Sequence, residues 1–120
     1  MSRQRGIGAE GEKRAQRYLR RKGYAIRAIN WSSIFGELDI IAEKNGVLVF
    51  VEVKARRGAD TEAALAGITA AKRERMIKAV YQYLDHCELD WESPWRIDVI
   101  AVALDGGGAT IAHVEDAFDW

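Results

Sequence analysis

The Asn45-Gly46 pair, set between two apolar-rich runs, constrains the fold more than any other feature of this chain. Asn-Gly favours a two-residue type I′ hairpin turn, because both central residues of that turn need a positive φ. With Asn45 and Gly46 forming the loop, Lys44 pairs with Val47 and the rest of the register follows. The sequence therefore predicts an antiparallel hairpin over residues 37–54.

Continuing this register places four charged side chains on one face of the hairpin. Asp39 falls opposite Glu52 and Glu37 falls opposite Lys54, because side chains alternate between the two faces of a strand. Like charges opposed in this way are destabilising. A divalent cation between Asp39 and Glu52 would remove the conflict, since Mg²⁺ usually binds one or two carboxylates together with phosphate oxygens. The hairpin thus predicts a metal-dependent phosphodiester site, with a structural ion-pair cluster as the alternative.

The length of 120 residues suits a single domain over residues 1–120, large enough to build a core without disulfides. Cys87 is the only cysteine, so neither an internal disulfide nor a cysteine zinc cluster is available. No apolar run approaches the roughly 20 residues that a membrane-spanning helix needs. The first residues also lack the apolar stretch of a signal peptide, so we expect a cytoplasmic protein with no membrane partner.

Charge is distributed unevenly along a chain whose formal net charge is zero. Residues 1–30 contain nine Arg and Lys against two Glu, whereas residues 81–120 contain one Arg against nine Asp and Glu. Such asymmetry is compatible with a basic face for nucleic acid and an acidic far side. A solvated basic helix explains the charge of the first segment equally well.

Hydrophobic periodicity and breaker residues predict a mixed α/β sheet with the hairpin near its centre. The run at 47–53 is nearly all apolar, as expected of a strand in the middle of a sheet. Thr69 has the character of a helix N-cap. The expected elements are a helix at 9–22, a strand at 24–31, the hairpin, a polar loop at 56–60, a short helical turn at 62–66, a long helix from Thr69 to about residue 86, and strands at 95–104 and 109–114.

Glu12 lies on the inward stripe of the first helix, because it precedes Ala15 by three residues and Leu19 by seven. An acid on a core-facing stripe is costly unless it is paired or bound to something. We therefore expect Glu12 to complete the metal site from outside the hairpin, either directly or through water.

The remaining site roles follow from the chemistry. Asp39 and Glu52 are expected to hold Mg²⁺ or Mn²⁺, which polarises the phosphoryl oxygen and lowers the pKa of bound water. Lys54 is expected to orient that water or to offset developing negative charge. Glu37, opposite Lys54, is expected to be an ion-pair partner that tunes this lysine.

Several other residues are candidates for simpler roles. Arg56, Arg57 and Lys72 are candidate phosphate contacts, although solvated loop arginines are nearly as good an explanation for the first two. The segment Gly6–Gly11 matches G-x-G-x-x-G, but no strand precedes it, so we interpret it as a flexible lead-in. Arg96 and Asp98 are expected to form a structural pair, and His113 belongs to no recognisable constellation.

These motifs resemble those of the YraN-type family, which is similar to the PD-(D/E)xK restriction-endonuclease-like superfamily and, within it, to archaeal Holliday-junction resolvases. The resemblance implies an α-β-β-β-α-β core. It also implies that Glu12, Asp39, Glu52 and Lys54 correspond to the helix acid, the metal aspartate, the second acid and the lysine. The motifs that carry it are Gly11-Glu12, Gly23-Tyr24, Asn30-Trp31, Gly36-Glu37-Leu38-Asp39, Glu52-Val53-Lys54-x-Arg56, Lys72, Arg96-x-Asp98 and His113-Val114-Glu115.

The sequence therefore predicts a Mg²⁺- or Mn²⁺-dependent endonuclease acting on DNA, with branched or repair intermediates as the substrates that the resemblance suggests. A homodimer would fit the resolvase analogy. The alternatives are a nucleic-acid-binding module of the same fold that no longer cuts, and a protein-interaction domain that uses the acidic C-terminal third. RNA remains an alternative to DNA.

Overall fold

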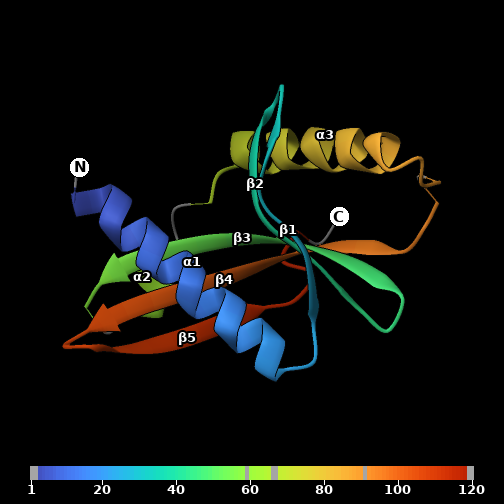
Figure 1. Ribbon diagram of the computed structural model, residues 1–120. Coiled ribbons are helices and arrows are strands. Elements are labelled where there is room, and N and C mark those ends of the chain that lie inside the picture. The colour runs from blue at the N-terminus through green and yellow to red at the C-terminus, as the bar shows by residue number, and fades with distance from the viewer. Residues whose placement is uncertain (1–2, 59, 66–67, 91, 119–120) are drawn as a thin grey trace.

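Five strands form one mixed sheet in the order β1-β2-β3-β4-β5. The computed structural model describes residues 3–58, 60–65, 68–90 and 92–118 (Figure 1). Strand β3 occupies the centre, antiparallel to β2 and parallel to β4, as its apolar sequence predicts. The elements, which confirm the expected α-β-β-β-α-β order, are α1 (Arg3–Arg21), β1 (Ala25–Ser33), β2 (Gly36–Lys44), β3 (Val47–Arg57), α2 (Thr61–Leu65), α3 (Ala70–His86), β4 (Trp95–Asp105) and β5 (Gly108–Val114).

The β2–β3 turn has the predicted geometry. Asn45 and Gly46 have φ values of 54° and 80°, as a type I′ turn requires. The predicted register is confirmed from the turn as far as the Ile40–Val51 pair. Beyond that pair the two strands no longer form a ladder, so Asp39 and Glu52 are not a directly paired couple.

Two hydrophobic layers cover opposite faces of the sheet, one beneath α1 and one beneath α3. The long helix α3 begins where expected, because the Thr69 hydroxyl accepts a hydrogen bond from the Lys72 amide at 3.1 Å. The α1 layer includes Ala15, Leu19, Ile40, Val49, Val51, Ile100 and Val102. The α3 layer includes Leu38, Ile41, Phe50, Met76, Val80, Tyr83, Leu84 and Ile97.

The distal part of the β1–β2 hairpin rises out of the sheet and lies alongside α3 (Figure 1). Trp31 packs edge-on against Tyr83 with ring centroids 5.2 Å apart, and the Ile34 amide donates to Gln82 Oε1 at 3.1 Å. Within β1, Asn30 has a left-handed φ of 52°. The β2–β3 ladder ends at Ile40, and the acidic side chains lie just beyond that point.

Two further expectations, about the start of α1 and the end of β3, are wrong. Helix α1 begins at Arg3, so the segment Gly6–Gly11 is helical and is not a flexible lead-in. A Cβ on Gly11 would lie 2.4 Å from the Ala55 Cβ, so glycine lets α1 approach β3 closely. Strand β3 continues to Arg57, which pairs with Leu104 on β4, so the expected polar loop starts later than residue 56.

The short helical turn expected at 62–66 corresponds to α2, and residue 66 itself lies outside the described residues. Within the described ranges, no helix combines the length and the apolarity that crossing a bilayer requires.

Candidate functional site

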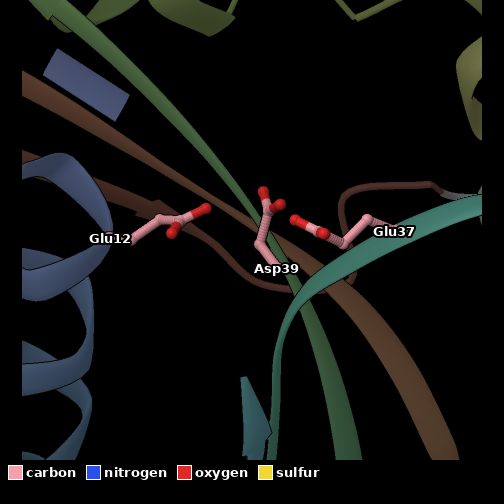
Figure 2. Close-up of side chains that lie close together, drawn as sticks. All are labelled: Glu12, Glu37 and Asp39. Atoms are coloured by element: carbon pink, nitrogen blue, oxygen red, sulfur yellow. The ribbon is translucent and has the colours of Figure 1, made fainter. Parts of the chain in front are cut away.

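Three carboxylates from two elements converge where β2 leaves β3. Glu12 comes from α1, whereas Glu37 and Asp39 come from β2, and Figure 2 shows the three side chains pointing toward one another. One oxygen from each lies within 4.8 Å of the others. We call Glu12, Glu37 and Asp39 the acid cluster.

Asp39 is anchored at the point where the ladder stops. Its Oδ2 accepts a hydrogen bond of 2.9 Å from the Val53 amide, a donor that would otherwise face β2 backbone. Burial and then the nearby charge of Glu52 raise the pKa of Asp39 to about 7, against the opposing effect of the Val53 hydrogen bond. Glu12 adds to the repulsion. The carboxylate is therefore positioned firmly but is poorly neutralised by the protein.

Glu12, on α1, is also partly buried close to other carboxylates. Burial first, and then the charge of Glu37, raise the pKa of Glu12. In the amide orientation that satisfies both acids, Asn30 donates to Glu37 Oε1 at 3.1 Å and to Glu12 Oε1 at 3.3 Å. Sequence reasoning assigned no role to Asn30. Two signals were available: Asn30-Trp31 is one of the motifs that carry the family resemblance, and an asparagine inside a strand pattern tolerates the left-handed φ observed here.

Glu52 lies beside the acid cluster but has cationic partners of its own. Its side chain is almost fully buried, and its Oε1 lies 2.8 Å from Lys72 Nζ and 3.5 Å from Lys54 Nζ. Burial alone would lower the pKa of Lys72, but the hydrogen bond to Glu52, the charge of Glu52 and further contacts with Lys54 and Asp39 together outweigh burial and raise it. Lys54 thus pairs with Glu52, whereas Glu37, its expected partner, joins the acid cluster.

Arg56 and Arg57, the other candidate phosphate contacts, are exposed at the far end of β3. Arg57 lines a surface hollow together with Gly6, Ile7 and Glu10 of α1. Strand β3 therefore carries Glu52, Lys54 and both arginines in sequence, leading from the buried site to the surface.

The donor chemistry of the acid cluster fits a hard divalent cation. All of its ligands are carboxylate oxygens, the type that Mg²⁺ and Mn²⁺ prefer. Burial and then the nearby charge of Glu52 raise the pKa of Asp39, and a bound cation would offset both effects. Glu12, Glu37 and Asp39 are the residues that could hold such a cation, with Glu52 adjacent.

A second buried carboxylate, Asp98 on β4, forms a balanced network. Arg96 Nε donates to Asp98 Oδ1 at 2.9 Å, which confirms the predicted structural pair. His113 Nε2 lies 2.7 Å from Asp98 Oδ2, and the Asp116 amide donates to Oδ1 at 3.0 Å. The His113 Nδ1 in turn contacts the Tyr18 hydroxyl at 3.1 Å. Sequence reasoning missed His113, because one partner, Asp98, lies on β4 and the other, Tyr18, lies on α1, 95 residues away along the chain.

The model of Uncharacterised protein family UPF0102 matches residues 11–102 of this chain. The chain belongs to that family. The matched range begins at Gly11 and includes Glu12, all of the hairpin acids and Asp98. Membership agrees with the resemblance to the YraN-type family that the motifs indicate.

Curated UPF0102 proteins from several bacteria are similar over most of the chain. One from Roseiflexus castenholzii is 44% identical over 98 residues, covering 82% of this chain and 79% of the relative. One from Myxococcus xanthus is 38% identical and covers 96% of this chain and 90% of the relative. One from Flavobacterium psychrophilum is 38% identical, with 98% of each chain covered.

Proposed function

We propose that this UPF0102 protein is a metal-dependent endonuclease that hydrolyses phosphodiester bonds in DNA. The observation that carries the proposal is the convergence of three carboxylates within 4.8 Å, beside a buried glutamate held by two lysines. Carboxylates next to lysines form a site that can hold both a hard cation and a phosphate group. The pKa of Asp39, raised to about 7 by burial and then by the charge of Glu52, supports this proposal, because strongly perturbed carboxyl groups cluster at functional sites.

In this proposal Glu12, Asp39 and Glu52 hold Mg²⁺ or Mn²⁺, and Glu37 joins them because of its position in the acid cluster. The bound cation would supply Lewis-acid polarisation of the phosphoryl oxygen and a lowered pKa for the attacking water. Lys54 donates from its ammonium group to that water or to a phosphate oxygen, and Glu52 holds it in place at 3.5 Å. Asn30 fixes the orientation of Glu12 and Glu37.

The distribution of basic residues supports nucleic acid as the substrate. Lys13, Arg17, Arg20 and Arg21 line a surface hollow on α1, the helix that also carries Glu12. Arg56, Arg57 and Lys72 are the proposed phosphate contacts around the site. Such contacts position a strand without reading its sequence. Branched or repair intermediates, a homodimer and a cytoplasmic location remain part of the proposal.

Incubation of the purified protein with Mn²⁺ and labelled duplex, single-stranded or four-way-junction DNA tests this proposal. We expect cleavage of at least one substrate, and a loss of at least 100-fold in Asp39→Ala, because metal-site carboxylates act at the reacting phosphate. Glu43→Ala is the matched control, since Glu43 lies on the same strand but pairs with Arg27. Cleavage that persists unchanged in Asp39→Ala would overturn the mechanism.

A nucleic-acid-binding module that does not cut is the second candidate. The observation that favours it is the 2.8 Å contact between Glu52 and Lys72, which neutralises one proposed ligand internally. Calorimetric titration with Mn²⁺ separates the two candidates. Salt-dependent DNA binding without metal binding or turnover would favour the binding module.

A further inference from the structure

The tip of the β1–β2 hairpin presents apolar side chains to solvent close to the acid cluster. Ile34 is 82% exposed and Phe35 is 36% exposed, and both directly precede strand β2 with its Glu37. Among the described large hydrophobic residues, Ile34 is the most exposed. Its exposure therefore requires an explanation that the core does not provide.

The backbone of the tip is held in one conformation. The Phe35 amide donates to Ser33 Oγ at 3.0 Å, and the Ser33 hydroxyl donates to the Gly36 carbonyl. The Ile34 amide donates to Gln82 on α3 at 3.1 Å. The two apolar side chains are thus presented on a rigid turn, and a rigid turn loses little conformational entropy when it binds a ligand.

Three cationic side chains of α3 lie near Phe35. A pocket of about 100 Å³ beside the acid cluster is lined by Phe35, Glu37, Lys72 and Arg75. The Lys78 ammonium lies 5.8 Å from the centre of the Phe35 ring. Arg75 and Lys78 form no ion pair with any side chain in the described part of the chain. An aromatic ring flanked by cations suits a nucleotide, which combines a flat base with an anionic phosphate.

We propose that Ile34 and Phe35 form a stacking site for an unpaired base of the DNA strand that enters the acid cluster. This inference rests on the proposed function and names the part of the substrate that the hairpin tip contacts. Base–aromatic stacking is worth about 1–3 kcal/mol per base, and apolar side chains insert readily between base steps. An unpaired base costs least to unstack, so DNA with a single-stranded segment is the preferred substrate. Arg75 and Lys78 hold the adjacent phosphates.

Binding measured without turnover tests the stacking site separately from cleavage. Fluorescence anisotropy in EDTA compares a labelled duplex with the same duplex carrying a single-stranded arm. We expect the wild-type protein to bind the armed DNA at least tenfold more tightly, and Ile34→Ser/Phe35→Ser to lose most of that preference. Leu89→Ser is the control, because Leu89 is similarly exposed at 42% but follows the C-terminal end of α3.

Three results would overturn the stacking site. The first is equal affinity of the wild-type protein for both DNAs, even if Mn²⁺-dependent cleavage is observed. The second is an unchanged preference in the double variant. The third is a wild-type dimer that the double variant converts to a monomer in analytical ultracentrifugation, since the tip would then contact a second copy. Conversely, a preference that depends on the tip supports the site even if no cleavage occurs.

Discussion

Asp39 and Asp98 are two carboxylates on neighbouring parts of one sheet, and their pKa values are shifted in opposite directions. At Asp98, burial alone would raise the pKa, but hydrogen bonds from His113, Arg96 and the Asp116 amide outweigh it and lower the pKa. At Asp39, burial and the charge of Glu52 raise the pKa to about 7, opposed mainly by one backbone hydrogen bond.

The difference separates a structural carboxylate from a functional candidate. The Asp98 side chain is fully buried and has a complete set of donors, so its charge helps to fasten β4 to β5 and to the segment after β5. The Asp39 side chain is placed among other acids at a gap between strands, where its charge lowers stability at neutral pH. Carboxyl groups with strongly perturbed pKa values cluster at functional sites.

The largest effect is expected at Asp98. Asp98→Ala leaves Arg96, His113 and the Asp116 amide without their shared acceptor, which should lower the free energy of unfolding by about 3–5 kcal/mol. Urea unfolding at pH 7 measures this loss. Asp105→Ala, an exposed acid at the end of the same strand, is the control and should change stability by less than about 0.5 kcal/mol.

The role assigned to Asp98 would be wrong if Asp98→Ala cost less than about 1 kcal/mol. If Asp98→Ala fails to fold, Asp98→Asn keeps a carbonyl acceptor and should retain the fold with an intermediate loss.

Asp39→Asn should raise the free energy of unfolding, whereas Asp98→Ala should lower it. An unfolded Asp ionises near pH 4 whereas folded Asp39 ionises at about pH 7, so wild-type stability falls as pH rises through this window. Asparagine does not titrate and can still accept from the Val53 amide. We expect Asp39→Asn to be more stable than wild type by up to about 4 kcal/mol at pH 8, with the difference shrinking toward zero near pH 4.

Urea unfolding at both pH values in EDTA checks this sign. A variant that is less stable than wild type at pH 8 would break the contrast between Asp39 and Asp98. Glu43→Gln, on the same strand, controls for the removal of one negative charge from β2.

Metal affinity should follow the ionisation of Asp39. At pH 6 about one Asp39 in ten is ionised and at pH 8 about nine in ten, so Mg²⁺ should bind about tenfold more weakly at pH 6. Isothermal titration calorimetry at the two pH values measures the ratio. Asp98→Asn should keep the same ratio, because its network is separate from the acid cluster. Equal affinities at both pH values would show that Asp39 is not a ligand.

The smallest effect is expected at Gly11. Gly11→Ala places a Cβ 2.4 Å from the Ala55 Cβ and should push α1, and with it Glu12, away from Asp39. Overpacking costs about 1–3 kcal/mol, and the better helix propensity of Ala returns about 1 kcal/mol, so we expect a net loss of about 1 kcal/mol. Mg²⁺ affinity should also fall.

Two controls sharpen the Gly11 experiment. Gly6→Ala lies in the same helix with no heavy atom within 4 Å of the added Cβ, and it should leave Mg²⁺ affinity unchanged. Adding Ala55→Gly to Gly11→Ala should restore the affinity, because it removes the contact. An undiminished affinity in Gly11→Ala would show that the position of Glu12 does not matter for the metal.

Local features of the chain predicted much of this architecture. The Asn45-Gly46 turn and its register follow from the positive φ that a type I′ turn demands, and both are confirmed. Thr69 was identified as a cap because a hydroxyl at that position can accept from the first turn. Features that depend on distant packing were not visible. The place of His113 beside Asp98 and Tyr18 is one such feature.

The sequence by itself determined the element order, the central hairpin and the residues that carry acidic chemistry, because turns, caps and side-chain alternation are local rules. Only the tertiary structure decided how those acids are grouped. Trp31 and Leu38 pack against α3, and the β2–β3 ladder ends at Ile40. Asp39 lies with Glu12 and Glu37, whereas Glu52 pairs with Lys54 and Lys72. This grouping depends on contacts between segments that are far apart in the chain, which local sequence rules do not determine.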